Sequence, residues 1–550
     1  MASDTDVAFP ILGGRDLDRL VARGHPRQVT KGEILFAQGD RNFCFYVVLE
    51  GAVDIIEHSS GTEKVVTTHR PGQFTGDIDT LTGRVALVTA RVAEAGRVQM
   101  LSTAELRKAV DELPEVGEVI IRAFLMRRRL LVEGDFVGVT IIGSRFSPAS
   151  HRLRDFAVRN LVPIRWRDLD TDVQAEEMLR QLGVPASETP IVIGVNGAIK
   201  RNPTLEQFAR CAGLVVSLEA DHVYDLVVVG AGPAGLAASV YAASEGLDVL
   251  TADTVAAGGQ AGTSARIENY LGFPTGISGR ELTQNALIQA QRFGAHITVP
   301  CTVRSLGIDG GVRVVTLADN TRIRTRCVLV ASGVQYRRLD VPRFEDFDGA
   351  GIYYAATEME AKMCGGEEVI VVGAGNSAGQ AVVNLARHAR RVHLVVRGPD
   401  LGASMSRYLV DRIEAMDNVT IHLNTNVTAL GGNGHLASVQ VVGGDGKQAT
   451  IDSSALFLFI GADPNTSWLR GCVELDKRGF VLTGIQLGPD TSAADRWRAL
   501  ERAPFLLETS LPGVFAAGDV RSGSVKRVAS AVGDGAMAVS FVHAHIGARV

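Results

Sequence analysis

The stretch Leu226–Gly235, LVVVGAGPAG, decides the fold of the larger part of this 550-residue chain. An aliphatic run typical of a buried strand enters it, and an alanine-rich segment typical of a helix leaves it. Gly230 allows a tight turn, Gly232 lets the backbone approach a diphosphate, and Gly235 lets helix and strand pack closely. The diphosphate then lies at the helix N-terminus, where free N–H groups and the helix dipole favour an anion. The stretch therefore predicts a dinucleotide-binding turn.

An acidic residue follows the second strand of the same unit. We expect that strand over Leu247–Leu250, and Asp253 stands 18 residues after Gly235. A carboxylate at this place accepts hydrogen bonds from a ribose. A glycine pattern alone is weak evidence, but the strand, helix and acid around it indicate a true dinucleotide site.

A second turn of the same kind occurs at Val369–Ala378, VIVVGAGNSA. Its candidate binding residues are Gly373, Gly375, Asn376, Ser377 and Ala378. The next strand, expected over Val392–Val396, ends in Arg397 instead of an acid. A cation there suits a 2′-phosphate and favours NADPH, with NADH and a simple surface ion pair as the alternatives.

A third signal is the segment VFAAGDV (Val514–Val520), which we interpret as a strand followed by a turn at Gly518 and Asp519. Asp519 is a candidate for binding the ribityl hydroxyls of FAD, and the helix expected from about Lys526 directs its N-terminal amides at the flavin. The candidate residues at that helix start are Lys526, Arg527 and Val528. The stretch 327–333, which ends in Gly333, returns the chain to the FAD domain. Two dinucleotide sites in one chain indicate a flavin and a nicotinamide acting in sequence.

With these motifs in place, residues 222–550 closely resemble the low-molecular-weight thioredoxin reductase family. The matching segments are GAGPAG (230–235), GGQ (258–260), IENYLGFP (267–274), GAGNSA (373–378) and TSLPGVFAAGDV (509–520). The resemblance implies an FAD domain interrupted by an NADPH domain, and a homodimer. It also implies FAD contacts from Gly259, Gln260 and Asn269.

The chain departs from this family at the redox centre. Members carry Cys-x-x-Cys just before the second turn, where this chain has Ala355 and Glu358. Neither residue forms a thiolate or a disulfide, so the family's flavin-to-dithiol relay is not expected. Cys364 follows without a partner, and we interpret it as a buried structural residue. Glu358 is either a proton donor or the start of a helix over Glu358–Met363, and no catalytic residue is assigned with certainty.

Composition limits the other possibilities. The length suggests about three to four domains. The net charge is −5, with 46% hydrophobic and 21% charged residues, which excludes a disordered chain and argues against nucleic-acid or membrane-surface binding. The first ten residues, MASDTDVAFP, have neither a basic nor an apolar signal region, so we expect no signal peptide in them. The glycine-rich apolar stretch 226–243 fits a buried turn better than a membrane span. Six cysteines without any CxxC argue against a zinc ribbon and against a local redox dithiol, and no metal site is expected. This cysteine usage favours a reducing, cytoplasmic location.

Residues 1–135 resemble cyclic-nucleotide-binding domains. The matching segments are KGEILFAQGD (31–40), FYVVLEG (45–51) and GQFTGDI (72–78), and we expect a turn at Gly51 between two strands. The resemblance implies that Asp77, after Gly76, holds a ribose 2′-hydroxyl. The arginine that pairs with the cyclic phosphate in such domains is replaced by Ala86, so nucleotide binding and a ligand-free regulatory or dimerising module both stay open.

Residues 136–218 alternate strands and helices and resemble glutaredoxin-like and thioredoxin-like domains. Ser147 and Ser150 stand where such domains carry Cys-Pro-x-Cys, and Thr189-Pro190 matches the loop that usually holds a cis-proline. A pair of serines has no disulfide chemistry, so we expect a docking or structural role.

The predicted fold class is multidomain, with a β-roll plus helices, an α/β thioredoxin-like domain, and two interleaved Rossmann-like domains. The expected segments are 1–135, 136–218, 222–338 (FAD), 339–464 (NAD(P)H) and 465–550 (FAD again). The predicted function is an FAD-dependent NAD(P)H oxidoreductase that passes electrons to an unidentified small molecule or redox protein. The alternative is a catalytically degenerate flavin-based sensor.

Overall fold

The computed structural model of the chain divides into two compact units by its internal contacts. It describes residues 4–41, 43–59, 62–133, 138–160, 162–194, 197–215, 222–264, 267, 269–348, 351–354, 356, 358–488, 497, 500 and 502–547. The first unit is Met1–Arg145, Leu153–Leu218 and Gln291–Pro300, and the second is Phe146–Arg152, Glu219–Ala290 and Cys301–Val550.

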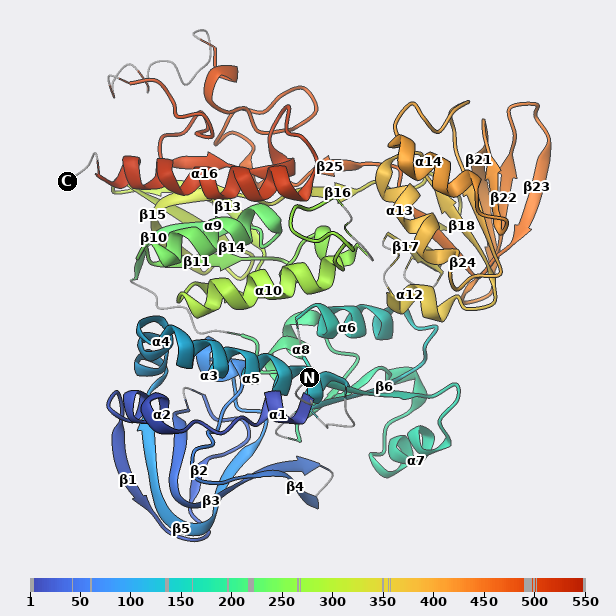
Figure 1. The fold of residues 1–550 in the computed structure, drawn as a ribbon. Coiled ribbons are helices and arrows are strands. Elements are labelled where there is room, and N and C mark those ends of the chain that lie inside the picture. Colours follow the sequence, from blue (N-terminus) through green and yellow to red (C-terminus); the bar gives the residue numbers. More distant parts are fainter. Residues whose placement is uncertain are drawn as a thin grey trace. The chain divides into compact units, whose positions relative to one another are not determined.

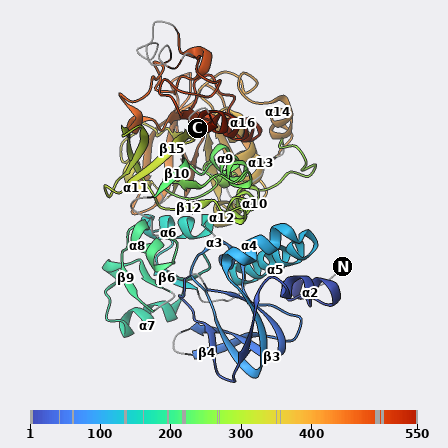
Figure 2. The same cartoon turned by 90° about the vertical axis from the view of Figure 1, so that its left-hand side faces the viewer.

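The N-terminal part of the first unit is an antiparallel sheet of order β1-β5-β3-β4, with β2 beside β5. Its strands are β1 (His25–Val29), β2 (Ile34–Phe36), β3 (Phe45–Ser59), β4 (Thr62–His69) and β5 (Thr89–Leu101). Its helices are α1 (Asp4–Ala8), α2 (Gly14–Val21), α3 (Ile78–Thr82), α4 (Thr103–Glu112) and α5 (Pro114–Glu133). Helices α4 and α5 lie side by side in both ribbon views (Figures 1 and 2).

The predicted turn at Gly51 is wrong, because β3 runs through it as one strand. Gly51 has φ +82°, and the register shifts between Glu50 and Ala52 against β5. A Cβ at this position would lie 2.4 Å from the carbonyl oxygen of Glu94. Glycine therefore permits a bulge in a continuing strand here, a role that sequence alone does not distinguish from a turn.

The middle segment forms a four-stranded sheet of order β7-β6-β8-β9. Strands β6 and β7 are parallel, whereas β8 runs antiparallel to β6 and to β9. Its elements are β6 (Val139–Gly143), α6 (Pro148–Arg159), β7 (Ile164–Asp168), α7 (Val173–Gln181), β8 (Ile191–Ile193), β9 (Ile199–Arg201) and α8 (Leu205–Cys211). The Thr189-Pro190 bond is cis.

The second unit contains a sheet in which β11, β10, β15 and β26 are parallel neighbours and β14 and β13 continue it as an antiparallel meander. Its elements are β10 (Val223–Val229), α9 (Pro233–Ser244), β11 (Val249–Ala252), α10 (Gly279–Arg292), β13 (Val303–Asp309), β14 (Val312–Leu317), β15 (Arg322–Val330), β26 (Val514–Ala516) and α16 (Val528–Gly547). The short strand β12 (His296–Thr298) belongs to the Gln291–Pro300 piece of the first unit. Buried aliphatic runs in β10 and β15 explain this parallel pairing, because such strands are covered on both faces.

An inserted segment builds a second parallel sheet of order β17-β24-β18-β19-β20, followed along the chain by the antiparallel ribbon β21-β22-β23. Its elements are α11 (Phe344–Phe347), β17 (Ile352–Tyr353), α12 (Glu358–Met363), β18 (Glu368–Val372), α13 (Asn376–Leu385), β19 (Arg391–Val395), α14 (Arg407–Glu414), β20 (Val419–His422), β21 (Asn426–Gly432), β22 (Leu436–Val442), β23 (Gln448–Asp452) and β24 (Ala455–Leu458).

Two antiparallel strands connect the insertion to the rest of the second unit. Strand β16 (Val334–Tyr336) leads into the insertion, and β25 (Ala462–Pro464) leads out of it. An Arg337–Asp463 ion pair of 2.9 Å and hydrogen bonds between Ser332 and Asn465 join the two connecting segments. The chain therefore enters and leaves the insertion at one place.

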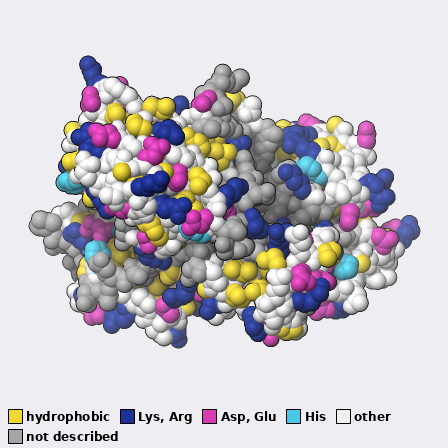
Figure 3. All heavy atoms as spheres, turned by 90° about the horizontal axis from the view of Figure 1, so that it is seen from below, with side chains coloured by type: hydrophobic (Ala, Val, Ile, Leu, Met, Phe, Trp, Pro, Cys, Tyr) yellow, Lys and Arg dark blue, Asp and Glu magenta, His cyan; other side chains and the backbone are white. Residues whose placement is uncertain are grey.

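The described surface mixes charges of both signs. Lys and Arg side chains are interspersed with Asp and Glu on the face drawn in Figure 3. Among the helices of the described residues, none combines the length and the apolar character needed to cross a membrane.

Candidate functional site

The first glycine turn has the geometry that its sequence predicts. Gly230 has φ +107°, and a Cβ there would lie 2.2 Å from the carbonyl oxygen of Ala331. A Cβ on Gly235 would lie 1.8 Å from the carbonyl oxygen of Gly230, so strand and helix approach closely. Gly232 is the N-cap of α9 and has no side chain to bond the first helical amides. These amides are therefore open to an anion.

A second glycine loop meets this turn backbone to backbone. Gly259 has φ +53°, and a Cβ on it would lie 2.9 Å from the Cα atom of Gly232. This contact leaves a cradle free of side chains, which fits the diphosphate of FAD. A larger residue at either glycine would fill it.

Asp253 holds the two loops together. One carboxylate oxygen accepts from the amide of Ala231 (2.8 Å), and the other accepts from the amides of Val255 (2.9 Å) and Ala256 (3.0 Å). A carboxylate has about four lone-pair sites, so three bonds leave room for a ribose hydroxyl. The predicted ribose contact stays a prediction, and the backbone contacts are an additional structural role.

The strand β26 brings Gly518 and Asp519 to the carboxyl end of the parallel sheet, beside β15. Gly518 has φ +75°, and its amide donates to Asp534 of α16 (3.1 Å). Arg521 also donates to Asp534 (3.2 Å), which fixes the turn to the helix. The side chain of Asp519 is half-buried, and burial raises the pKa of its carboxyl.

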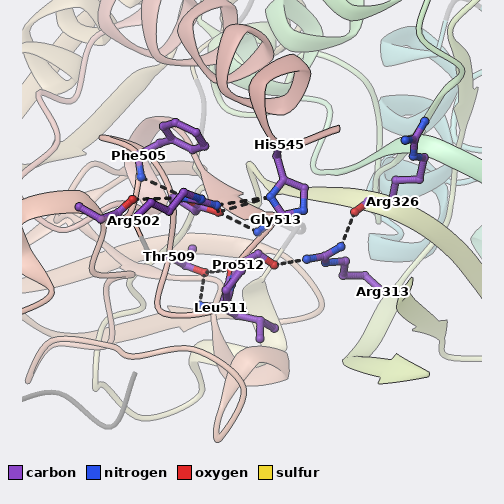
Figure 4. A network of polar contacts seen from close by, with 11 residues as sticks. Arg313, Arg326, Arg502, Phe505, Thr509, Leu511, Pro512, Gly513 and His545 are labelled. Atoms are coloured by element: carbon purple, nitrogen blue, oxygen red, sulfur yellow. Dashed lines mark hydrogen bonds and ion pairs between the residues drawn. The ribbon is translucent and has the colours of Figure 1, made fainter. Parts of the chain in front are cut away.

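A buried carboxylate organises the loop that leads into β26 (Figure 4). Glu508 is fully buried and receives two parallel hydrogen bonds from Arg502, of 2.7 and 2.9 Å. The amides of Phe505 (3.0 Å) and Gly513 (2.8 Å) donate to the same carboxylate. Arg313 donates to the carbonyl oxygen of Pro512. The TSLPG segment is therefore a rigid support for the Gly518 turn, since a bidentate arginine fixes both charge and direction.

Helix α16 begins at Val528, two residues after the predicted start. Lys526 and Arg527 are exposed and precede the helix, and the ammonium group of Lys526 donates to the carbonyl oxygen of Asp519 (3.2 Å). Val528 is half-buried against the apolar cluster of Ala261, Ile267 and Ile277. The helix start therefore lies beside the segment that follows Gln260.

Three further predicted FAD residues lie in this unit. The amide nitrogen of Gln260 donates to the carbonyl oxygen of Val334, at the start of β16. Asn269 is exposed, and Gly333 has φ +62° with open space around it. Their contacts with FAD stay predictions.

The second glycine turn also has an uncapped helix start. Gly373 has φ +146°, and a Cβ there would lie 2.4 Å from the carbonyl oxygen of Phe459. Gly375 is the N-cap of α13 without a side-chain cap bond. Asn376 accepts from the amide of Ser406 (2.6 Å), whereas Ser377 is exposed and Ala378 is buried. This turn fits the diphosphate of a nicotinamide nucleotide.

Arg397 follows β19 at the carboxyl end of the inserted sheet and is exposed. No ion pair joins it to another residue of the described part of the chain. The contact of Arg397 with a 2′-phosphate stays a prediction.

The redox-centre positions are only partly described. Ala355 lies outside the described residues, and the side chain of Glu358 does too, although α12 begins at Glu358 as predicted. All six cysteines are free, and Cys364 is buried. Burial raises the pKa of the Cys364 thiol to about 12, so it is protonated at neutral pH.

In the N-terminal domain, Asp77 has other partners than a ribose. Its carboxylate pairs with Arg128 (3.0 Å) and accepts from the amide of Asp79 as the cap of α3. Gly76 has φ +93°, and its carbonyl oxygen accepts from Arg127 (2.6 Å).

Sequence reasoning missed several residues that shape these sites. They are Asp534, Arg521, Ser332, Asn465 and Ser406. Each bonds a residue 13 or more positions away along the chain. No local motif marks such a pair, so only the fold identifies them.

Comparison with known proteins matches two segments of the chain. Residues 224–535 match the family model described as pyridine nucleotide-disulphide oxidoreductase, and residues 26–112 match that of the cyclic nucleotide-binding domain. Neither model includes the middle segment, so its glutaredoxin-like character stays a prediction.

Individual relatives agree with the first of these models. A thioredoxin reductase of Mycolicibacterium smegmatis is 33% identical over 322 residues, which is 58% of this chain and 94% of the relative. NADPH-dependent thioredoxin reductase 3 of Arabidopsis thaliana is 32% identical over 58% of this chain and 57% of its own length. The crystal structure of T. acidophilum thioredoxin reductase has TM-score 0.52 and 29% identity, covering 59% of this chain and 99% of that structure.

Thioredoxin reductases use FAD and NADPH, and the two uncapped glycine turns fit these two nucleotides. With a matched segment that spans more than half of its length, the chain belongs to the pyridine nucleotide-disulphide oxidoreductase family, with thioredoxin reductases as relatives and a cyclic nucleotide-binding domain at its N-terminal side.

Proposed function

We propose that this chain transfers electrons from NADPH through FAD to an acceptor outside the chain, without a dithiol of its own. The observation that carries this proposal is the state of the cysteines. All six are free, and the two that are nearest in sequence, Cys301 and Cys327, are 26 residues apart. A relay through the protein needs two neighbouring thiols, one of them ionised.

The thiol nearest the expected redox position is unsuited to that relay. Cys364 is 4% exposed and lies in the core cluster of the inserted domain. Since burial raises the pKa of this thiol to about 12, almost none of it is thiolate at neutral pH. Cys301 is buried in the same way, and the pKa of its thiol is also raised to about 12.

The side chains and loops of this unit hold the nucleotides in place. When bound, FAD supplies a two-electron carrier that exchanges a hydride with nicotinamide. The Gly232 and Gly259 backbones receive one diphosphate, and the Gly375 turn receives the other. Asp534 and Arg521 fix the turn that presents Asp519. Hydride transfer of this kind depends on positioning, which is what these contacts supply.

An anaerobic titration with NADPH, followed at the flavin absorbance, tests the proposal. We expect NADPH to bleach the bound flavin, and small oxidants or redox proteins to restore it. Thioredoxin is expected to remain oxidised under the same conditions. Failure of both NADPH and NADH to reduce the flavin would show that the chain is not a dehydrogenase. Thioredoxin reduction that disappears in Cys364→Ala would show that a thiol relay exists.

A second function is favoured by the loss of both dithiols, at Ala355/Glu358 and at Ser147/Ser150. In that case bound flavin acts as a redox sensor, with output through the N-terminal domain. Slow turnover with every acceptor, combined with a change in the X-ray scattering profile on flavin reduction, distinguishes the sensor from the enzyme. An unchanged profile would argue against it.

We further propose a cytoplasmic homodimer whose N-terminal domain modulates turnover, because the resemblance to thioredoxin reductases implies a dimer and a cyclic nucleotide-binding domain is a regulatory module. Analytical ultracentrifugation of the full chain measures the mass, and a monomer at micromolar concentration would contradict the dimer.

A further inference from the structure

A cavity of about 340 Å³ lies within the N-terminal sheet domain. Apolar side chains make up most of its wall, among them Phe36, Phe43, Ile55, Leu87 and Leu130. Apolar cavities of about 150 Å³ already bind benzene, and small-molecule sites begin near ~300 Å³. The cavity is therefore large enough for a small ligand with an apolar body.

The polar groups that would hold a cyclic nucleotide are missing or engaged. Ala86 replaces the arginine that would meet the cyclic phosphate, and its amide and carbonyl groups already bond Asp40 and Gly39. The carboxylate of Asp77 pairs with Arg128 and caps α3. A ribose and a cyclic phosphate would thus enter an apolar space without their usual partners, which is costly.

A buried cation, Arg127, faces this space; it forms no ion pair with a carboxylate of the described residues, although the charge of the nearby Asp77 acts on it. Arg127 lines the cavity and is 7% exposed. Its Nε and one Nη donate to the carbonyl oxygens of Ala8 (2.7 Å) and Gly76 (2.6 Å). The rings of Phe9 and Phe74 lie 5.3 and 4.8 Å from its guanidinium carbon. Its second Nη is buried and has no hydrogen-bond partner among the described residues.

Positive charge exceeds negative charge in the cluster around Arg127. The guanidinium groups of Arg84, Arg127 and Arg128 share two carboxylates, those of Asp77 and Asp79, and both carboxylates form ion pairs with Arg128. Across β3 and β4, Glu57 stands opposite Lys64. Burial lowers the pKa of Arg127 to about 9, so the side chain is still a cation at neutral pH. A ligand anion would therefore complete this charge arrangement.

A second unpartnered group lines the same cavity. His69 is 1% exposed, and its Nδ1 has no hydrogen-bond partner among the described residues. Burial, and then the charge of Arg127, hold the pKa of His69 well below its usual value, so the ring is neutral. A neutral imidazole with the proton on Nδ1 donates one hydrogen bond.

We propose that this cavity binds a small apolar monocarboxylate, with the carboxylate accepting hydrogen bonds from Arg127 and His69 and the apolar body packed against the Phe36 and Phe43 side. A guanidinium–carboxylate pair in apolar surroundings is directional and charge-assisted, so it selects an anion over a neutral molecule of the same shape. Binding of such a ligand does not depend on the redox chemistry of the second unit.

Isothermal titration calorimetry of the full FAD-loaded chain tests this site with octanoate and 1-octanol as probes. We expect octanoate to bind about tenfold or more tightly than 1-octanol, which is the value of one charge-assisted hydrogen bond. Arg127→Met keeps the apolar stem and should bring the ratio to about one. Arg122→Met, at an exposed position of the same helix, should leave the ratio unchanged.

Three results would overturn the proposal. They are no octanoate binding up to millimolar concentration, equal binding of octanoate and 1-octanol to the unmodified chain, and displacement of octanoate by micromolar cyclic AMP or cyclic GMP. If Arg127→Met fails to fold by circular dichroism, the comparison of the two probes on the unmodified chain and on His69→Phe still decides the matter.

Discussion

Cys364 is the residue at which the proposed mechanism is most directly testable. With a pKa of about 12, on the order of 10⁻⁵ of its thiol is ionised at pH 7.5. We expect Cys364→Ala to reduce flavin with NADPH at the unmodified rate. In the native chain, mass spectrometry should find Cys364 unmodified by iodoacetamide while the half-buried Cys472 reacts first. A large loss of acceptor reduction in the variant would contradict this.

Arg397 is expected to set the choice between the two nicotinamide nucleotides. Removing its charge in Arg397→Ala deletes a bond to the 2′-phosphate, which is present in NADPH and absent in NADH. The KM for NADPH should rise about ten- to a hundredfold, with little change for NADH. Arg391→Ala, at the exposed start of the same strand, is the matched control. Equal effects of Arg397→Ala on both nucleotides would contradict the assignment.

At this scale, the sequence located the glycines and acids but not all of their partners. Gly230, Gly235 and Gly373 have the positions and close approaches that their motif predicts. Asp253 and Asp77 were expected to contact ribose hydroxyls, yet each also bonds backbone amides, and Asp77 pairs with Arg128, 51 residues away. A motif records which residue type is needed, whereas the partners of a charge depend on the fold.

At the scale of helices, α9 packs against α16, and the two run alongside each other in Figure 1. This packing supports the glycine turn at residues 230–235, from which α9 starts. A Cβ on Gly535 would lie 2.1 Å from the carbonyl oxygen of Ala234, at the first turn of α9. Gly535→Ala should therefore separate the helices, destabilise the unit by about 1–3 kcal/mol and lower its FAD content.

Gly533 on the same helix supplies the control, because open space surrounds it. Gly533→Ala should keep its FAD and gain up to about 1 kcal/mol from helix propensity. The FAD-to-chain ratio after gel filtration and the melting temperature report both effects. Identical behaviour of the two variants would show that the helix contact does not support the site.

The loop before β26 depends on the buried Glu508 carboxylate. In Glu508→Gln, an amide NH₂ replaces one acceptor opposite backbone donors, and Arg502 loses its charge partner. We expect a loss of about 3–5 kcal/mol in unfolding free energy. Glu245→Gln, in an exposed pair with His543, should cost less than about 1 kcal/mol. A small effect of Glu508→Gln in thermal unfolding would mean that the loop is held by its backbone contacts alone.

Most elements were predictable from periodicity, and their ends less so. The helix at Glu358–Met363 begins and ends as predicted, whereas β11 and α16 each begin two residues later than expected. The bulge at Gly51 was mistaken for a turn because φ > 0 serves both. The pairing of β16 with β25 joins segments more than 120 residues apart, and no local pattern announces it.

For the whole molecule, two compact units predict separate responses to ligands. In calorimetry of the full chain, excess FAD should raise only the transition of the second unit, and octanoate only that of the first. Ligand at a hundredfold its Kd stabilises by ~2.7 kcal/mol, or a few degrees. A single transition that shifts equally with either ligand would show that the units unfold together.

Because β16 and β25 pair where the chain enters and leaves the insertion, the inserted segment, for which we propose nicotinamide binding, forms a cassette that can be removed. Tyr336 stands opposite Ala462, so a two-residue hairpin turn could join the strands directly and bypass the residues between them. Since both ends of the cassette meet at one place, another compact domain with neighbouring termini could take its position. The flavin scaffold would then accept electron-donor modules by exchange, which is how a single scaffold can acquire new donors during evolution or in the laboratory.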